Sequence, residues 1–498
     1  MSLETLVKQW LSWDRDSATR KTIEELWRDQ NTEKLQQLLC TRMEFGTAGI
    51  RGRMGAGFSQ MNSLTIIQTA QGLCAYLKSS FAAEELSSKG VVIGFDGRHG
   101  SKDFARYSAN VFLNAGIRTC LFRQVVPTPF VPFSIRHYGC LAGVMVTASH
   151  NPKEDNGYKV YWSNGAQIVS PHDKNISKAI MENLAPLESS WETAPGAIDP
   201  FDEIWTQYFA TLEAEYKPLA SGYPVNLTYT AMHGVGCPFT VKALETAGVP
   251  RNCIHVVKAQ ADPDPEFSTV VFPNPEEGAG TLTLAMETAA ATDSLYILAN
   301  DPDADRLAVA EKQKDGSWRV FNGNEIGALL GWWIVFHARR CGETLDNCYL
   351  ISSTVSSMIL RSISQKEGMH FEETLTGFKW MGSLAENIQK TSSARVLMAF
   401  EEAIGYMCGT RVFDKDGVTA AAIVADMISY IMKEEHGKRL SEKLIEVFQM
   451  YGFHFTCNSY VIAKDPSLVK EMFKAIATMN NGAYPTEVAG SQPCKGNV

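Results

Sequence analysis

One polar segment, residues 147–156, combines a serine with several hydrogen-bond donors at the end of an apolar run. The run at 141–146 is predicted to be a buried strand, which Pro152 ends. Sheets in α/β proteins bind ligands at the ends of their strands, where Ser149 stands beside His150. Serine alone is a poor nucleophile, so this setting indicates a serine that carries or transfers a group with help from its neighbours. An ordinary strand-to-loop turn explains the same composition, since Ser, Asn and Pro are common in turns.

A second polar turn reads Asn-Asp-Pro-Asp-Ala-Asp-Arg, ends at Arg306 and follows another apolar run. Its carboxylates, Asp301, Asp303 and Asp305, stand at alternate positions and can converge on one point if the loop is turn-like. Hard oxygen ligands of this kind suit Mg2+ or Ca2+, and they leave room for water and a phosphate oxygen. An EF-hand is excluded, because Arg306 and Lys312 stand where its loop requires glycine and glutamate. A solvated acidic turn is the alternative.

Together the two turns resemble motifs of the α-D-phosphohexomutase family, and further segments extend the resemblance over nearly the whole chain. These are Phe-Gly-Thr-Ala-Gly-Ile-Arg at 45–51, Thr-Gly-Phe-Lys-Trp-Met-Gly at 376–382 and Phe-Glu-Glu-Ala-Ile-Gly-Tyr at 400–406. Longer strings at 156–162 and 372–381 resemble the branch that contains phosphopentomutase/phosphoglucomutase and its relative, glucose 1,6-bisphosphate synthase. Taken in order, these motifs are too specific for a chance match.

The resemblance implies an α/β fold: three similar α/β domains with mixed sheets around a central cleft, and a fourth domain that is largely missing here. It implies that Ser149 gives a phosphoryl group to the substrate, forms a sugar bisphosphate, and takes back the other phosphate. Ser149 and the carboxylates of Asp301, Asp303 and Asp305 would hold Mg2+, with glucose 1,6-bisphosphate or a pentose bisphosphate as primer. Arg306 would lie close to the transferring group, or form a salt bridge to a neighbouring aspartate.

Several basic side chains match positions that this family places around the phosphate. Lys159 and Lys379 match lysines near the reacting oxygens, and they would serve as proton acceptor and donor or as permanent cations. His150 would orient the phosphate on the serine or simply hydrogen-bond the loop. Arg51, in a glycine-rich loop, would clamp a phosphate, with the adjacent Arg53 as a competitor for that role.

Two adjacent carboxylates, Glu401 and Glu402, follow a strand-like run and can accept hydrogen bonds from sugar hydroxyls. Many family members carry Ser where this chain has Ala403, which is consistent with the branch that handles pentose phosphates. A glycosidase-like pair is excluded, because adjacent residues rarely straddle a substrate. The acidic stretch Asp-Pro-Asp-Pro-Glu that begins at Asp262 is stiffened by proline and is predicted to be a surface loop, not a metal site.

Length and composition limit the class of protein. A chain of 498 residues is too long for one core and predicts about three or four domains. The net charge of -9 argues against nucleic acid as a partner, so the site must concentrate its own basic residues. No secretory signal opens the chain, and the eleven cysteines show no zinc spacing. The longest apolar run, 326–336, is too short to span a bilayer and is predicted to be a buried helix. A cytoplasmic protein without a membrane partner is expected.

The pattern along the chain predicts α/β organisation. Apolar residues at helical spacing predict helices over the first forty or so residues, and strand candidates at 91–95 and 141–146 flank a helical pattern at 102–115. An apolar strand runs into a polar turn at Ser149 and again at Asp301 and Glu401, which is a weak repeat of domain-sized spacing. The predicted division is 1–195 for N-terminal helices plus a phosphoserine domain, 196–318 for a metal-binding domain, 319–452 for a sugar-binding domain and 453–498 for a remnant of the C-terminal phosphate-binding domain.

The end of the chain departs from the resemblance. Family members carry an Arg-x-Ser-Gly-Thr-Glu-Pro loop that grips the distal phosphate, and no such string occurs here. The residues after 452 are too few for a typical domain. Because binding energy from a remote phosphate helps to orient a substrate, this form is expected to be severely weakened or inactive, and less stable with a domain face exposed.

The leading hypothesis is a Mg2+-dependent phosphomutase. It would interconvert ribose 1-phosphate and ribose 5-phosphate, or the deoxy forms, and act more weakly between glucose 1-phosphate and glucose 6-phosphate. Glucose 1,6-bisphosphate synthase, in which a different donor charges the serine, is the alternative within the same class of site. A truncated, non-catalytic isoform that binds sugar phosphates is the alternative from a different class. The preferred sugar and the oligomeric state stay open.

Overall fold

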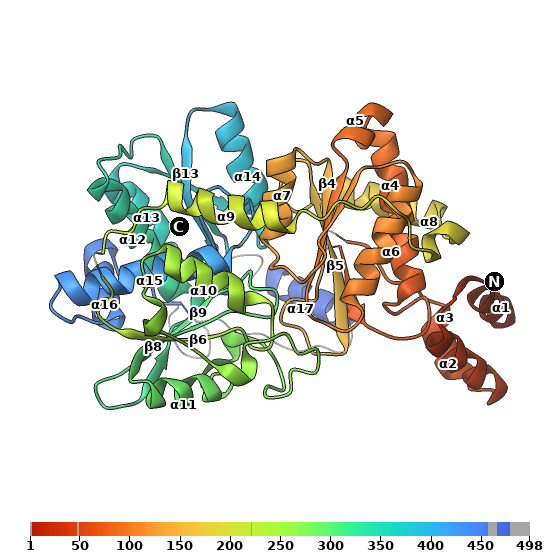
Figure 1. Ribbon diagram of the computed structural model, residues 1–498, viewed down its shortest axis with the longest axis horizontal. Helices are drawn as coiled ribbons and strands as arrows, with labels where there is room; N and C mark the ends of the chain where they lie inside the picture. The colour runs from red at the N-terminus through yellow and green to blue at the C-terminus, as the bar shows by residue number, and fades with distance from the viewer. Residues whose placement is uncertain (1, 47–48, 221, 457–465, 479–498) are drawn as a thin grey trace. The chain divides into compact units, whose positions relative to one another are not determined.

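The computed structural model describes residues 2–46, 49–220, 222–456 and 466–478. The chain divides into two compact units, Met1–His454 and Phe455–Val498, and three sheets lie in the first unit (Figure 1). The described part of the second unit forms one helix, α17 (Pro466–Thr478). The predicted remnant at 453–498 therefore falls largely outside the described residues, and the predicted boundaries between domains stay predictions.

The predicted N-terminal helices are present as α1 (Leu3–Trp13), α2 (Ser17–Arg28) and α3 (Thr32–Leu39). Asp16 begins α2, because its carboxylate accepts hydrogen bonds from the first free backbone N–H groups of the helix. The helices pack around Trp10, which is fully buried and meets Phe58 edge-on with 5.1 Å between ring centroids. Aromatic burial thus fixes this helical extension to the segment that follows it.

The first sheet has the strand order β1-β5-β4-β2-β3 and mixes parallel and antiparallel pairs. Alternate residues of β2 face opposite sides: Val91 and Ile93 join one apolar cluster, and Val92 joins another. Helices therefore cover both faces, with α6 and α4 on one side and α7 on the other (Figure 1). The elements are β1 (Ile50–Arg53), α4 (Ser63–Ser80), α5 (Ala83–Ser88), β2 (Val91–Phe95), α6 (Ser101–Asn114), β3 (Thr119–Leu121), α7 (Phe130–Tyr138), β4 (Ala142–Val146), β5 (Asp155–Trp162), α8 (His172–Glu182) and η1 (Glu188–Trp191).

The second sheet repeats this arrangement with the order β10-β9-β8-β6-β7, and again its last three strands are parallel. Its central strands β6 and β8 are buried, as the apolar run before Asp301 predicts. The elements are α9 (Phe201–Glu215), β6 (Asn226–Thr230), α10 (Gly236–Thr246), η2 (Arg251–Cys253), β7 (Ile254–Val256), η3 (Lys258–Gln260), η4 (Pro275–Gly280), α11 (Thr283–Ala291), β8 (Ser294–Ala299), β9 (Ala308–Lys312) and β10 (Trp318–Val320).

The third sheet has the order β12-β11-β13-β14, in which three strands are parallel and β14 is antiparallel. It matches the other two sheets without their outer antiparallel strand, so the expected three similar α/β domains with mixed sheets are confirmed. The elements are α12 (Gly323–Arg340), β11 (Cys348–Ser353), α13 (Ile359–Glu367), β12 (His370–Thr374), α14 (Phe378–Thr391), β13 (Arg395–Glu401), β14 (Gly405–Cys408), α15 (Gly417–Glu434) and α16 (Leu440–Tyr451).

The three polar turns occupy equivalent places in the three sheets. Each connects a parallel strand to the antiparallel strand beside it, between β4 and β5, between β8 and β9, and between β13 and β14. Each also holds a non-glycine residue in the left-handed region, namely Ser149, Ala304 and Ile404, with φ between 50° and 55°. Since such residues are uncommon, their recurrence supports the repeat that the sequence indicates.

The apolar run at 326–336 lies within α12, a buried helix of 18 residues whose start is capped by Asn322 and Glu325. Among the described residues, none of the helices combines the length and the apolar character that a membrane crossing requires.

Close packing at the start of α15 predicts the effect of one substitution. Asp416 caps this helix, and a Cβ on Gly417 would collide with the backbone carbonyl of Arg306 in the second polar turn. Gly417→Ala should therefore destabilise the protein by about 1–3 kcal/mol through overpacking, more than the helix gain of about 1 kcal/mol. Thermal unfolding measures this loss. Gly280→Ala, where a Cβ meets no atom within 4 Å, is the control, and equal melting temperatures for the two variants would contradict the prediction.

Candidate active site

The second polar turn forms a compact acidic cluster. Asp301, Asp303 and Asp305 are fully buried, and one carboxylate oxygen of each lies within 4.8 Å of the others. Asp303 Oδ1 and Asp305 Oδ1 are buried without a hydrogen-bond partner. Buried carboxylate oxygens without a donor are destabilising unless a cation takes them, so the cluster fits a divalent metal site.

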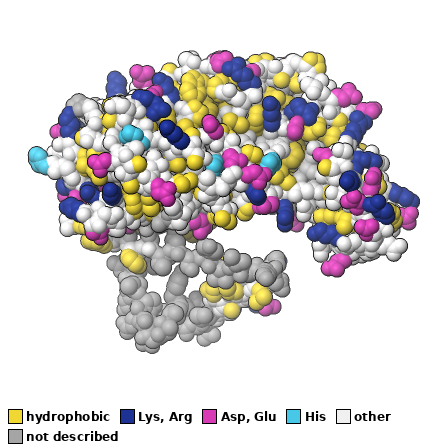
Figure 2. Space-filling model, turned by 60° about the horizontal axis from the view of Figure 1, so that its bottom comes forward, with side chains coloured by type: hydrophobic (Ala, Val, Ile, Leu, Met, Phe, Trp, Pro, Cys, Tyr) yellow, Lys and Arg dark blue, Asp and Glu magenta, His cyan; other side chains and the backbone are white. Residues whose placement is uncertain are grey.

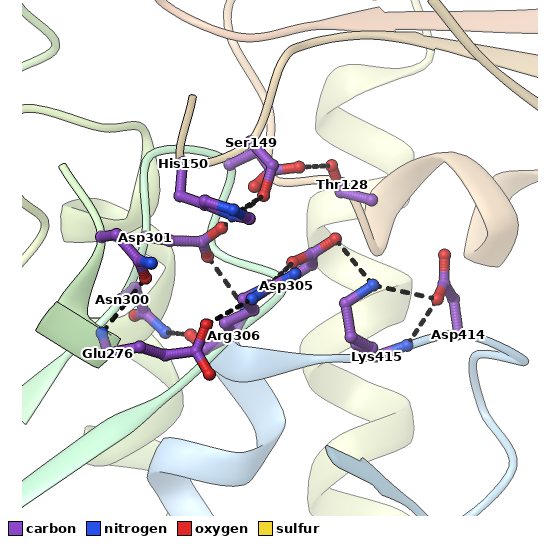
Figure 3. A network of polar contacts seen from close by, with 12 residues as sticks. Thr128, Ser149, His150, Glu276, Asn300, Asp301, Asp305, Arg306, Asp414 and Lys415 are labelled. Atoms are coloured by element: carbon purple, nitrogen blue, oxygen red, sulfur yellow. Dashed lines mark hydrogen bonds and ion pairs between the residues drawn. The ribbon is translucent and has the colours of Figure 1, made fainter. Parts of the chain in front are cut away.

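Cationic side chains from the first and third sheets lie against this cluster. Lys159 on β5 donates to Asp303 Oδ2 at 2.7 Å and to Asp305 Oδ2 at 2.9 Å. Lys415, between β14 and α15, lies 3.3 Å from Asp305 Oδ2 (Figure 3). The face drawn in Figure 2 carries Lys and Arg interspersed with Asp and Glu, whereas these two lysines are buried, with exposed fractions of 6% and 7%. The protein thus concentrates positive charge locally despite its net charge of -9.

The three carboxylates differ in their affinity for protons. Burial raises the pKa of Asp301 well above its usual range, and the nearby charge of Asp303 adds to this effect. Burial acts in the same direction on Asp303, but Lys159 and the hydrogen bonds outweigh it and hold the pKa of Asp303 well below its usual range. Lys159 in turn keeps its proton, because the carboxylates outweigh its burial and raise its pKa. The cluster therefore contains fixed charges close to a group that can share a proton.

Ser149 faces this cluster from the first sheet (Figure 3). Its hydroxyl donates to Asp301 Oδ2 at 2.7 Å and lies 3.3 Å from Nδ1 of His150. A left-handed backbone costs a non-glycine residue about 1–3 kcal/mol, so its surroundings must hold Ser149 in place. Burial lowers the pKa of His150 to about 3, helped by Arg306, so this ring is neutral near pH 7. The serine hydroxyl thus lies beside a metal loop and a neutral imidazole.

Arg306 lies at the centre of the network in Figure 3. Its backbone N–H donates to Asp301 Oδ1 at 3.0 Å, and its guanidinium donates to Glu276 Oε2 at 2.9 Å. Only 14% of its side chain is exposed. Of the two roles that the sequence left open, the ion pair with a carboxylate is present, but its closest partner is Glu276 and not a neighbouring aspartate, since Asp305 Oδ1 lies 3.9 Å from Nε.

The carboxylate pair at the end of β13 reaches the same network. Glu401 is buried, and burial raises its pKa. Glu402 is half-buried and accepts a hydrogen bond from Ser356 Oγ at 3.0 Å, while its own N–H donates to that hydroxyl at 2.9 Å. Gly405 lies against Glu401 and Lys415, which places the third polar turn beside the cluster.

Two predicted site residues lie further out. Arg51 on β1 is exposed, and its guanidinium donates to Asn151 Oδ1 at 3.1 Å, so it reaches the serine turn. Part of its glycine-rich loop, residues 47–48, falls outside the described residues. Lys379 is half-buried near the start of α14, and burial lowers its pKa. Its neighbour Phe378 lies under the Lys415 ammonium, 5.5 Å from the ring centroid, so this turn borders the network.

The structure adds residues that the sequence reasoning missed. Lys415 belongs to a polar turn, Asp-Lys-Asp-Gly, before an apolar helix, which was a signal comparable to the serine turn. Thr128 donates to Asp303 Oδ2 at 2.6 Å, and Glu276 holds Arg306. No local pattern marks these two, because each acts only through a contact distant in the sequence. Among the described residues, the acidic side chains that lie close enough together to hold a metal ion are those of the aspartate triplet, and the exclusion of the stretch that begins at Asp262 stays a prediction.

Comparison with known proteins identifies relatives of this arrangement. Models for phosphoglucomutase/phosphomannomutase α/β/α domains I, II and III match residues 42–186, 205–316 and 322–451. Human phosphopentomutase is 48% identical over 489 residues, covering 95% of this chain and 79% of that protein. Human glucose 1,6-bisphosphate synthase is 43% identical over 500 residues, covering 96% and 78%. A solved phosphoglucomutase/phosphomannomutase family protein from Burkholderia thailandensis shares the fold with a TM-score of 0.62 at 20% identity, over 81% of this chain and 79% of that one.

The unsatisfied carboxylate oxygens predict that metal binding stabilises the fold. Mg2+ at a hundred times its dissociation constant should stabilise the protein by about 2.7 kcal/mol, seen as a higher melting temperature. Asp303→Asn should remove most of this rise, because a neutral amide replaces a buried ligand. Asp262→Asn, in the exposed acidic stretch, is the matched control and should keep the full rise. An equal rise in both variants would contradict a metal site at the triplet.

Proposed function

Since the chain belongs to the phosphoglucomutase/phosphomannomutase family and is a phosphomutase, an intramolecular phosphotransferase, we propose that its main reaction interconverts ribose 1-phosphate and ribose 5-phosphate or their deoxy forms. The interconversion of glucose 1-phosphate and glucose 6-phosphate is proposed as a weaker activity. The preference for pentose is supported by higher identity to phosphopentomutase than to glucose 1,6-bisphosphate synthase, 48% against 43%. Ala403, which offers no hydroxyl beside Glu402, agrees with this preference.

The observation that carries the mechanism is the hydrogen bond of 2.7 Å between the Ser149 hydroxyl and Asp301. It supports Ser149 as the residue that carries the phosphoryl group. In the proposed step, the bond between Ser149 Oγ and phosphorus breaks while a sugar hydroxyl forms a new bond to phosphorus. The hydroxyl proton passes to a basic side chain, and Oγ keeps the electron pair of the broken bond. The reverse step, on the other phosphate of the resulting bisphosphate, returns a phosphoryl group to the serine.

Transfer of this kind depends on positioning and on charge neutralisation. Mg2+ bound by Asp301, Asp303 and Asp305 would supply Lewis-acid neutralisation of phosphate charge. Buried cations such as Lys159 would hold the carboxylates of this loop in place. Arg306 would release its ion pair with Glu276 and then bind a phosphate oxygen.

The remaining proposed roles concern substrate and protons. Lys379, whose pKa is lowered by burial, suits a proton acceptor better than an exposed lysine does. His150, a neutral ring beside the serine, would orient the phosphate. Arg51 would clamp a phosphate at the exposed edge of the serine turn, and Glu401 and Glu402 would accept hydrogen bonds from sugar hydroxyls.

A second candidate within the same site is glucose 1,6-bisphosphate synthesis, which the 43% identity to that synthase favours. The two reactions differ in the donor that charges the serine. Comparing glucose 1,6-bisphosphate with other phosphoryl donors, by label transfer to the protein, separates them. Turnover of sugar monophosphate with a catalytic amount of bisphosphate favours the mutase, and net formation of bisphosphate from another donor favours the synthase.

Ser149→Ala should abolish turnover, because it removes the hydroxyl that is proposed to carry the phosphoryl group beside Asp301. The assay contains the chain, Mg2+, ribose 1-phosphate and a catalytic amount of glucose 1,6-bisphosphate. A loss of at least about a thousandfold is expected, as for other catalytic nucleophiles. Ser108→Ala, which changes a buried serine hydroxyl on α6 that donates to the Phe104 carbonyl of its own helix, is the matched control. Turnover that survives Ser149→Ala would rule out the proposed role of this serine.

A further inference from the structure

Arg98, in the turn after β2, binds the backbone of the serine turn with nearly all of its hydrogen-bonding capacity. Its Nη2 donates to the carbonyl oxygens of Ser149 and Asn151 at 2.5 and 2.6 Å, and its Nη1 donates to those of Pro152 and Asp155 at 2.8 and 3.3 Å. A guanidinium has five N–H donors in a fixed plane. Four carbonyls from one turn therefore meet one rigid group.

Beside these four contacts, Nε of Arg98 forms an ion pair without a hydrogen bond, and an aromatic ring covers the guanidinium plane. Nε lies 3.4 Å from Asp96 Oδ2, and the side chains of both residues are 1% exposed. Asp96 is held in turn, because Ser101 Oγ donates to its other oxygen at 2.6 Å. Phe267, from the segment between β7 and α11, covers the guanidinium with 4.9 Å between its ring centroid and the Arg98 Cζ. Water is thus kept away from the carbonyl contacts.

These contacts surround a residue whose backbone is strained. Ser149 has a φ of 52° and its carbonyl accepts from Arg98. A strained conformation persists only where the surrounding structure determines it more than once. Lysine, with a single ammonium on a flexible stem, cannot present a planar array of donors to several carbonyls.

The other two sheets show the same relation between neighbouring turns. The turn after β6 supports the metal loop, since Val235 N–H donates to Pro302 O at 2.9 Å. The turn after β11 supports the third polar turn, since Ser356 Oγ donates to Glu402 Oε2 at 3.0 Å. Adjacent parallel strands bring these turns together at their carboxyl ends. In the first sheet, the guanidinium of Arg98 provides four hydrogen bonds at the place where the other two sheets have one or two.

We propose that Arg98 is the positioning residue of the nucleophile: it fixes the serine turn so that the Ser149 hydroxyl points at the metal loop. This inference rests on the proposed role of Ser149 as phosphoryl carrier. In this role, Arg98 acts only through the serine turn and contacts neither the substrate nor the metal. Its loss would shift the hydroxyl without removing any reacting group, and misplacement by about 1 Å can slow a reaction about a hundredfold.

The test is a rapid-quench experiment in the presence of Mg2+, with glucose 1,6-bisphosphate whose phosphates carry a radioactive label. It measures the rate constant and the amplitude of label transfer to the protein. For Arg98→Lys we expect the rate constant to fall about a hundredfold, with little change in the bisphosphate concentration that gives half the maximal rate. A merely structural role would lower the folded fraction, and hence the amplitude, at an unchanged rate constant.

Arg42→Lys is the matched control, because Arg42 also lies over a phenylalanine, with 4.0 Å from its Cζ to the Phe58 ring centroid, and hydrogen-bonds Gln68. An Arg98→Lys rate constant equal to that of Arg42→Lys would overturn the inference. If Arg98→Lys does not fold, Asp96→Asn gives the same measurement. A slower transfer supports the positioning role, and an unchanged rate constant overturns it. A wild-type chain that takes no label would overturn the proposed role of Ser149 itself.

Discussion

The structure depends on neutralising buried negative charge where the three sheets meet. The second sheet supplies Asp301, Asp303 and Asp305, the first supplies Lys159, and Lys415 follows the last strand of the third. Separating buried charges from their partners is strongly unfavourable, because each would remain desolvated and unpaired. The same ion pairs therefore link the three sheets and assemble the site, beside an apolar cluster that all three sheets share.

A common topology explains why the polar turns meet. In each sheet the functional turn lies between a central parallel strand and its antiparallel neighbour, and it contains a left-handed residue. This shared bend directs Ser149, the aspartate triplet and the two glutamates away from the sheets that carry them. The turn before each of them, after β2, β6 and β11, supplies a supporting contact. In the proposed function, one structural solution thus serves three chemical purposes, namely carrying a group, binding a metal and recognising a sugar.

The sequence predicted the parts of this arrangement that are local. The strand before Ser149, the aspartate spacing and the buried helix at 326–336 follow from apolar runs and turn composition, and the structure has all three. Long-range contacts were not predictable. Arg98 stands in an ordinary-looking turn, and its role depends on carbonyls some fifty positions away. Backbone strain was equally hidden, since Ser, Ala and Ile at 149, 304 and 404 carry no preference for a left-handed conformation.

The ion pair between Arg306 and Glu276 gives the site the character of an anion exchanger. In the proposed function, an arriving phosphate would not meet an unpaired guanidinium but would take the place of a carboxylate that belongs to the protein. The binding energy gained is then the difference between two ion pairs, which is smaller than the whole of either. A reaction whose intermediate must leave its contacts, turn over and bind again benefits from such an exchange, because release is assisted by a counter-ion that is already present.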